Sequence, residues 1–420
     1  MSFQQGLSGL NASSKNLEVI ANNIANANTY GAKTSRAEFS AVYATALNGS
    51  GNNVVGIGTS LQAVAQQFTQ GNVSTTDNPL DLAINGAGFF QLRDNEGQTT
   101  YTRNGQFKLD RDGYLVNNAL DRLMGYAADG NGLVQSGQLV PLRLPTGGID
   151  PNPTTRAELE LNLDSRKAVT LPAAAPQIDF ANANTYNNAT SVTVYDTKGQ
   201  EVALGLYFQK SANDTWNVYA TANGSTVGGV AGAPLPITTI NFRSDGSGPL
   251  APNAPVAINV PASTNAAGAQ TEAIAGLLFD FSGATQFGAA YGITDLRQDG
   301  FSAGQLSSIA VEPNGILTAR YSNGQSKPAG QIELASFRNP QGLQPLADNA
   351  WGRTYISGDP IYGVPGDANF GVLQAGALEE SNVDLTGELV NMITAQRVYQ
   401  ANAQSIKTQD QVLQTLVNLR

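Results

Sequence analysis

The nineteen prolines of this 420-residue chain all lie between Pro79 and Pro365, so both ends of the chain lack proline. A proline inside a helix costs about 3 kcal/mol, because it removes a backbone hydrogen bond and clashes with the preceding turn. Long helices are therefore allowed at the two ends and disfavoured in the middle. The 45 glycines and the charged fraction of only 13% are typical of a body rich in strands and turns.

Apolar residues repeat every seven positions at both ends, with further members four positions on. The N-terminal set is Phe3, Leu7, Leu10, Leu17, Ala21 and Ile24. The C-terminal set is Leu385, Leu389, Met392, Tyr399, Ala403, Ile406, Leu413 and Val417. This spacing predicts amphipathic, coiled-coil-like helices over residues 1–30 and 380–420. It leaves open whether the two helices pair with each other or each cap a local domain.

The N-terminal helix is expected to be weak on its own. It contains Gly6, Gly9, several serines, and a run of asparagines from Asn11 to Asn28. Glycine costs about 1 kcal/mol in a helix interior and serine or asparagine some tenths, whereas burying one large apolar side chain returns roughly 1.5–3 kcal/mol. We therefore expect this helix to be stable only when it is packed, against its own chain or against other molecules.

Strand patterns dominate between the two ends. Residues 80–92 alternate in polarity, and residues 100–116 carry Asn104-Gly105 and Asp112-Gly113 as expected tight turns between short strands. Residues 307–337 form a similar unit, with turns at Asn314-Gly315 and Asn323-Gly324. The pattern predicts one inner β domain made from residues 76–144 and 300–379.

Residues 145–299 are richer in Ala, Asn, Thr and Pro and predict a separate outer β domain, inserted into the inner one. Two apolar faces support it, Val202, Leu204, Leu206 and Phe208 in the first strand and Trp216, Val218 and Ala220 in the next. Residues 31–75 show no firm period and are expected to be a linker with short structure. The predicted fold class is mixed, with an α-helical terminal coiled-coil domain and two mainly β domains.

Composition excludes several kinds of chemistry. The chain has no cysteine and no histidine, which removes disulfides, thiolate nucleophiles, Cys/His zinc sites and imidazole triads. A net charge of −10 leaves little basis for nucleic-acid binding. Asp110 and Asp112 lack the glutamate that completes a calcium loop, so we interpret them as a hairpin turn. The pair Glu379-Glu380 is interpreted as favouring the start of the last helix rather than as catalytic.

Targeting signals are also missing from the sequence pattern. No run of eighteen apolar residues occurs, so no membrane insertion is expected. The first residues lack the basic start and cleavage site of a signal peptide, so export would use a route without a cleaved signal. No catalytic, cofactor-binding or metal-ligating residue is predicted, and no cofactor.

The asparagine-rich end of the first helix carries a family resemblance. Asn22, Asn23, Ala25, Asn26, Thr29, Gly31 and Lys33 form a pattern that resembles the N-terminal signature of bacterial flagellar rod and hook proteins. Residues 366–420 resemble the terminal segment of the same family. The stretches NPLDLAINGAGFFQL and YTRNGQFKLDRDGYLVNN resemble its β domain.

The resemblance implies a helical homopolymer outside the cell, with paired terminal helices lining a central channel and no enzymatic activity. The large segment 145–299 favours the hook branch, a curved tube that transmits motor torque as a universal joint, over the distal rod branch. Implied partners are other copies of the chain, the distal rod protein, the hook cap, the hook–filament junction proteins and the export apparatus. The alternatives are a distal rod protein, a secreted β-rich carbohydrate-active enzyme using paired carboxylates, and a phage-tail-like or adhesin fibre.

The apolar repeats and three asparagines are the expected assembly interface. Two interpretations of the asparagines stay open: they bind neighbouring chains, or they only end the helix, with Gly31 in a left-handed turn. We expect both. The predicted interface residues are Phe3, Leu7, Leu10, Leu17, Ile24, Asn22, Asn23, Asn26, Leu385, Leu389, Met392, Tyr399, Ile406, Leu413 and Val417.

Overall fold

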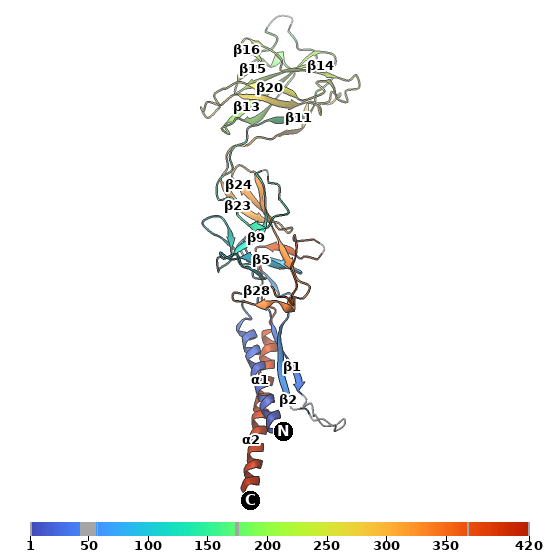
Figure 1. Ribbon diagram of the computed structural model, residues 1–420. Coiled ribbons are helices and arrows are strands. Elements are labelled where there is room, and N and C mark those ends of the chain that lie inside the picture. The colour runs from blue at the N-terminus through green and yellow to red at the C-terminus, as the bar shows by residue number, and fades with distance from the viewer. Residues whose placement is uncertain are drawn as a thin grey trace. The chain divides into compact units, whose positions relative to one another are not determined.

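The computed structural model describes residues 2–42, 56, 58–130, 132–172, 176–367 and 369–418, with side chains from Phe3 to Thr415 (Figure 1). The chain divides into two compact units. Unit 1 comprises Met1–Thr146, Ser308–Arg320 and Ser326–Arg420, and unit 2 comprises Gly147–Ser307 and Tyr321–Gln325. Most elements are strands, with one long helix at each end, which confirms the predicted helical termini and mainly β body.

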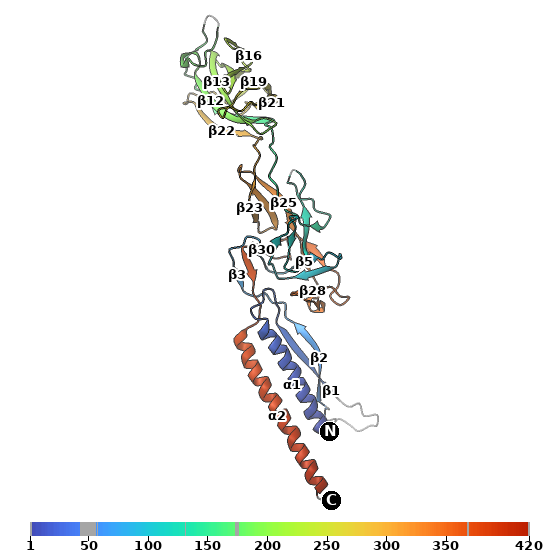
Figure 2. The same ribbon diagram turned by 90° about the vertical axis from the view of Figure 1, so that its left-hand side faces the viewer.

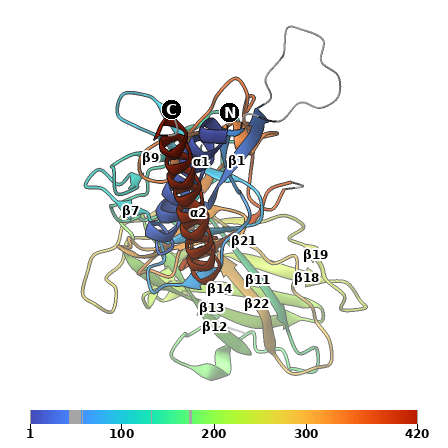
Figure 3. The same cartoon turned by 90° about the horizontal axis from the view of Figure 1, so that it is seen from below.

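Unit 1 begins and ends with the two long helices, α1 (Ser2–Ala25) and α2 (Leu385–Asn418). They lie side by side in two perpendicular views (Figures 2 and 3) and contact each other along most of α1. Asp384 caps α2, because its Oδ1 accepts a hydrogen bond of 3.0 Å from the backbone N–H of Thr386. Past the end of α1, Gly31 takes the expected left-handed conformation, with φ of +71°.

The range 31–75 contains more structure than the expected linker. Strands β1 (Ser35–Val42) and β2 (Gly58–Gln66) pair antiparallel, from Ser35 opposite Gln66 to Val42 opposite Gly58. This hairpin packs on α1. Most of its side chains stay exposed or half-buried, so no alternation of polarity marks the strands in the sequence.

The remainder of unit 1 is a β domain built from both halves of the chain. The strands that precede residue 146 are β3 (Val73–Thr75), β4 (Leu82–Asn85), β5 (Phe89–Arg93), β6 (Thr99–Thr102), β7 (Lys108–Leu109), β8 (Leu115–Val116), β9 (Arg122–Ala127) and β10 (Val140–Pro141). The later strands are β23 (Leu306–Val311), β24 (Ile316–Tyr321), β25 (Ser326–Ile332), β26 (Leu334–Ser336), β27 (Gln344–Pro345), β28 (Ala350–Gly352), β29 (Ile361–Gly363), β30 (Val372–Ala375) and β31 (Ala377–Glu379).

The two halves join where β25 pairs with β9, with Gly330 opposite Ala127. The main sheet has the order β23-β24-β25-β9-β5-β6-β28-β27. Its core contains the buried side chains of Leu82, Phe90, Leu123 and Leu334. Strands from before residue 146 and from after residue 305 are thus held in one sheet.

The expected tight turns are confirmed at three of four places. Gly113, Gly315 and Gly324 have positive φ between paired strands. The prediction at Asn104-Gly105 is wrong, because β6 pairs with β5 and β28 rather than with β7. A Cβ on Gly105 would overlap the Leu82 carbonyl oxygen. This glycine therefore permits a close approach of two backbones.

Unit 2 is a sandwich of two larger sheets, and β16 and β17 form a further two-stranded sheet in it. The first sheet has the order β12-β13-β14-β18-β19, with β15 at the side of β14, and the second has the order β20-β21-β11-β22. The strands are β11 (Arg156–Asn162), β12 (Asn188–Tyr195), β13 (Glu201–Ala212), β14 (Thr215–Ala222), β15 (Ser225–Val227), β16 (Gly229–Val230), β17 (Ala233–Pro234), β18 (Thr238–Phe242), β19 (Pro249–Ala251), β20 (Val256–Val260), β21 (Ile274–Asp280) and β22 (Gly292–Gln298).

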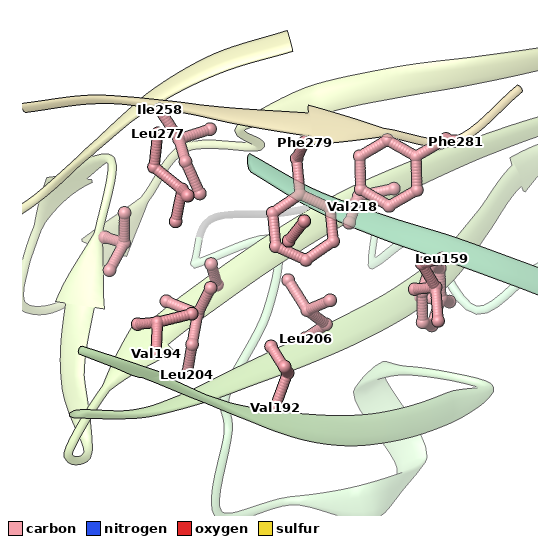
Figure 4. Packing of buried hydrophobic residues seen from close by; sticks show 14 of the residues in the cluster. Leu159, Val192, Val194, Leu204, Leu206, Val218, Ile258, Leu277, Phe279 and Phe281 are labelled. Atoms are coloured by element: carbon pink, nitrogen blue, oxygen red, sulfur yellow. The ribbon is translucent and has the colours of Figure 1, made fainter. Parts of the chain in front are cut away.

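Apolar side chains from both sheets meet in one core (Figure 4). The predicted inward faces of β13 and β14 are confirmed. Val202, Leu204, Leu206 and Phe208 are fully buried, and so are Trp216, Val218 and Ala220. Phe279 and Phe281 of the opposite sheet stack on each other, with ring centroids 5.1 Å apart. Alternation of polarity predicted these faces because each strand buries one side.

Candidate assembly interface

The contact between α1 and α2 includes small and polar residues as well as the apolar Ile406. A Cβ on Gly6 would lie 2.9 Å from Cγ1 of Ile406, and a Cβ on Gly9 would lie 3.0 Å from the Asn402 carboxamide. Asn402 Nδ2 donates to Ser13 Oγ at 3.4 Å. The helices therefore do pair within one chain, and Ile406 of the predicted repeat lies at their seam beside Gly6. Glycine and serine let the backbones approach closely there.

The predicted interface residues are distributed unevenly around this seam. The exposed ones are Phe3, Leu7, Asn22, Leu385, Leu389, Tyr399 and Leu413. The half-buried ones are Leu10, Leu17, Ile24, Asn26, Met392 and Ile406. Asn23 is buried, and the side chain of Val417 lies outside the described residues. Most of the large apolar side chains are therefore not covered by their own chain.

Sequence reasoning missed four further exposed apolar residues on α2. These are Val390, Ile393, Val398 and Val412, and they do not belong to the seven-residue repeat. The spacing of three between Val390 and Ile393 was a signal, because residues three apart share a helix face. Together with the predicted residues they give α2 apolar side chains on more than one side.

Asn23 and Asn26 make hydrogen bonds within their own chain. Asn23 Nδ2 donates to the Ser35 carbonyl at 2.8 Å, and the Ser35 N–H donates to Asn23 Oδ1 at 2.9 Å. Asn26 Nδ2 donates to the Asn22 carbonyl at 3.0 Å, in the last turn of α1. Asn23 thus fastens β1 to α1 within the chain, and its place in the predicted interface stays a prediction. The exposed Asn22 remains a candidate.

A buried ionic junction, formed by Lys33, Arg103 and Glu379, holds the helix pair to the β domain. Lys33 Nζ lies 2.5 Å from Glu379 Oε1, and Arg103 Nη1 lies 3.2 Å from Glu379 Oε2. All three side chains are almost fully buried. Burial lowers the pKa of Lys33 and of Arg103, and the Glu379 carboxylate opposes both shifts.

The junction corrects the interpretation of Glu379. This residue is the end of β31 and an internal anion, not part of the start of α2, which Asp384 caps. The backbone N–H of Gly31 also donates to the Glu379 carbonyl at 2.8 Å. The segment that follows α1 and the segment that precedes α2 are therefore held together at Glu379. No local pattern predicts this, because Lys33 and Glu379 are 346 positions apart.

The rest of the described chain offers few features of a reaction site. Among the described residues there is no group of three or more Asp and Glu side chains placed to hold a metal ion. Neither described helix has the length and apolar character needed to cross a membrane. The most distinctive surface is therefore the helix pair with its uncovered apolar side chains.

Comparison with protein families matches both ends of the chain and much of its middle. Residues 3–33 match the model described as flagella basal body rod protein, and residues 83–199 match the flagellar hook protein FlgE/F/G D1 domain. Residues 162–301 match the flagellar basal body protein FlaE D2 domain. Residues 374–419 match the flagellar basal body rod FlgEFG protein C-terminal model.

Relatives match over their full length. The chain is 40% identical to the flagellar hook protein FlgE of Salmonella typhimurium and 41% identical to that of Escherichia coli K12, covering 100% of both chains in each case. It is 32% identical to the flagellar hook protein FlgE of Rhizobium meliloti, over 100% of this chain and 98% of the relative.

A solved structure agrees at the level of the fold. The crystal structure of Helicobacter pylori flagellar hook protein FlgE2 matches with a TM-score of 0.53 at 16% identity, covering 73% of this chain and 100% of that chain. Full-length relatives that are hook proteins favour the hook branch over the distal rod, and they argue against the enzyme and fibre alternatives. The chain belongs to the flagellar hook protein family and is a structural subunit of the bacterial flagellar hook.

Proposed function

We propose that the terminal helices of neighbouring copies form the inner wall of the hook tube, around a channel for exported proteins. The observation that carries this proposal is the set of apolar side chains left uncovered on α1 and α2. Leu389, Val390 and Ile393 are each about half exposed, at 46%, 58% and 52%. Burying one such side chain is worth roughly 1.5–3 kcal/mol, and monomeric proteins rarely leave contiguous apolar surface uncovered.

We further propose that the hook is a curved, flexible tube that works as a universal joint, with unit 2 as an outer domain inserted into the β domain of unit 1. What supports the insertion is the pairing of the two ends of that segment. The Ile149 N–H donates to the Gly304 carbonyl at 2.8 Å, and the Gly304 N–H donates back at 3.1 Å. A joint needs inner contacts that persist and outer contacts that exchange, and a separate outer domain supplies the second kind.

The remaining parts of the proposal concern place and partners. The subunit reaches the outside of the cell without a cleaved signal peptide. It meets the distal rod protein at one end of the hook and the hook–filament junction proteins at the other, with the hook cap and the export apparatus taking part during assembly. These partners follow from the family, whose members are hook proteins. The protein acts as a structural component and not as an enzyme.

Limited proteolysis tests the role of the helices. Residues 1–30 and 383–420 are expected to be cut in the monomer, because α1 is rich in poor helix formers, and to be protected in the polymer. The β strands of unit 2 serve as the internal control, since their core is the same in both states. Equal cutting of the helices in monomer and polymer would contradict the proposal.

Deletion of the outer domain tests its role as part of the joint. Residues 150–303 are removed, and the paired ends at Ile149 and Gly304 are joined by a short Gly/Ser linker. The shortened chain is expected to fold and to assemble, because the helices and the β domain of unit 1 are retained. Electron microscopy should show straight tubes, since the outer contacts that set curvature are gone. Tubes of unchanged curvature would refute the outer domain's role.

A further inference from the structure

A groove of about 420 Å³ runs between α1, α2 and the start of β1. Its apolar lining includes Val19 and Ile20 from α1 and Ala395 and Val398 from α2. The Glu388 carboxylate also lines it. The groove therefore combines an apolar floor with one acidic group, and all its walls belong to unit 1.

The Glu388 carboxylate is only half satisfied. Its Oε1 accepts a hydrogen bond of 3.2 Å from Asn23 Nδ2. Its Oε2 is buried and has no hydrogen-bond partner within the described part of the chain. Arg36 lies at the same groove, but its guanidinium pairs with Glu38 at 2.7 Å. A buried carboxylate oxygen without a partner costs free energy, so the groove favours a cation from outside the chain.

A complementary stripe lies on the other side of α2. Arg397 follows Glu388 by nine residues, which is two and a half helical turns and places it on the opposite face. Val390 and Ile393 precede Arg397 by seven and four positions, so they share its face, and all three side chains are exposed. The Arg397 side chain makes no ion pair or hydrogen bond with any described residue. We call Val390, Ile393 and Arg397 the docking stripe.

We propose that the docking stripe of one copy seats in the groove of the next copy, with Arg397 pairing with Glu388 Oε2. This inference rests on the proposed role of the helices as the inner wall. The stripe and the groove match in chemistry, apolar against apolar and cation against carboxylate. Because they lie on opposite faces of one helix, the contact is heterologous, and it repeats from copy to copy into an open helical polymer where the rotation between copies does not close a ring.

Lys407 is the rival cation on the same helix. It is exposed, but the positions three and four residues away on either side hold polar or small residues, namely Gln404, Ala403, Asp410 and Gln411. It therefore lacks the apolar neighbours that would fill the groove. A guanidinium also pairs with a carboxylate through two parallel hydrogen bonds, which an ammonium cannot do. Arg397 is thus the better match.

Charge reversal tests the pair in the full-length chain. Glu388→Arg and Arg397→Glu are each expected to raise the protein concentration needed for polymerisation by about tenfold or more. In the double variant, the concentration needed for polymerisation should return most of the way to that of the unchanged protein. Glu388→Gln keeps an acceptor for Asn23. It should raise the concentration needed for polymerisation by less than the charge reversals do, and this increase should not depend on salt. Monomer circular dichroism confirms that each variant is folded.

The outcomes separate this contact from the general role of the helices. If the single reversals assemble normally while Leu413→Asp does not, the helices form the interface but the pairing is wrong. If the single reversals fail and the double variant fails equally, the pairing is also wrong. If the helices are cut by protease equally in monomer and polymer, the proposed inner wall itself fails.

Cysteine cross-linking gives a second, independent test, because the chain has no cysteine of its own. In the variant Glu388→Cys with Arg397→Cys, nine helical residues separate the two Cα atoms by roughly 13 Å, and a disulfide needs less than about 7 Å. Any bond between them is therefore intermolecular. Oxidised polymer should give a ladder of cross-linked oligomers on a non-reducing gel. A ladder from Glu388→Cys with Lys407→Cys, and none from the first variant, would overturn the assignment of Arg397.

Discussion

The sandwich of unit 2 and the helix pair of unit 1 bury different shares of their large apolar side chains. In the sandwich the largest apolar groups are inside: Trp216 and Phe279 are fully buried, and the Trp216 indole donates to Gln286 Oε1 at 3.0 Å. In the helix pair the polar Ser13 and Asn23 are buried, whereas Leu413 is 54% exposed. The sandwich buries its large apolar side chains within one chain, whereas the helix pair leaves several of them exposed.

This contrast separates folding from assembly. Each fully buried large side chain of the sandwich contributes roughly 1.5–3 kcal/mol without any partner molecule. The helix pair depends instead on the close packing of Ile406 and Asn402 side chains against Gly6 and Gly9 and on hydrogen bonds such as that from Asn23 to Glu388. Its largest apolar groups remain available for neighbours. The four predictions that follow are ordered by their expected effect on the stability of the monomer.

Trp216→Ala should have the largest effect, a loss of about 3–5 kcal/mol in the free energy of unfolding of unit 2. The large side chain leaves a cavity at the centre of the sandwich. Urea unfolding followed by circular dichroism measures the loss, and the fluorescence of Trp351, buried in unit 1, reports whether unit 1 is unchanged. Leu235→Ala, at a residue that is 61% exposed, is the control and should change stability by less than about 0.5 kcal/mol.

Glu379→Gln should cost about 3 kcal/mol, because it leaves Lys33 and Arg103 as buried charges without their anion. Differential scanning calorimetry of the monomer measures this loss. The matched control is Glu38→Gln, which removes an exposed ion pair with Arg36 and should cost less than about 0.5 kcal/mol. Equal effects of the two changes would show that the junction is not structural.

The pH dependence of the Glu379→Gln variant sharpens this second prediction. Burial holds the folded-state pKa of Lys33 below its ordinary value of 10.5. At any pH between this lowered pKa and 10.5, the unfolded chain therefore binds more protons than the folded chain. Stability then rises with pH in that window. The variant should recover part of its loss as the pH approaches 10.5, and a Lys33→Met, Glu379→Gln double variant should not show this recovery.

Gly6→Leu should cost about 1–3 kcal/mol, because even a Cβ at this position would lie 2.9 Å from Cγ1 of Ile406 and so forces the two helices apart. Hydrogen exchange of the α1 amides should become faster, while exchange in unit 2 stays the same. Gln4→Leu is the matched control, since Gln4 is exposed on the same helix. If both variants exchange alike, the small-residue seam does not determine the packing of the pair.

Leu413→Asp should have the smallest effect on the monomer, within about 0.5 kcal/mol, because the side chain is already exposed. Polymerisation should nevertheless be lost, since assembly would bury a carboxylate without a partner. Leu17→Asp should affect both properties, because Leu17 is half-buried. Sedimentation and electron microscopy measure assembly, and normal tubes from Leu413→Asp would exclude this residue from the interface.

Local patterns predicted much of the fold. The proline-free ends and the seven-residue repeat predicted helices over 1–30 and 380–420, and the structure places them at Ser2–Ala25 and Leu385–Asn418. Alternation of polarity predicted the inward face of β13. These predictions succeed because periodicity along the chain records which side of a single element is buried.

Contacts between distant residues were not predictable in this way. The β1–β2 hairpin has no deeply buried face, so it carries no alternation. The role of Gly105 depends on the Leu82 carbonyl, and the role of Glu379 depends on Lys33 and Arg103. The residue types were visible in the sequence, but their partners were not. The signature residue Lys33 was noticed only through family resemblance.

The sequence by itself determined where helices can form, which strand faces are buried, and that large apolar groups recur at both ends, because each of these depends on neighbouring residues alone. Only the tertiary structure decided which side of each helix is used inside the chain. It placed Gly6, Gly9 and Ser13 at the seam and left Leu389 and Leu413 outside. The physical reason is that a helix has several faces, and the one that packs is selected by the shape of a partner far away in the sequence.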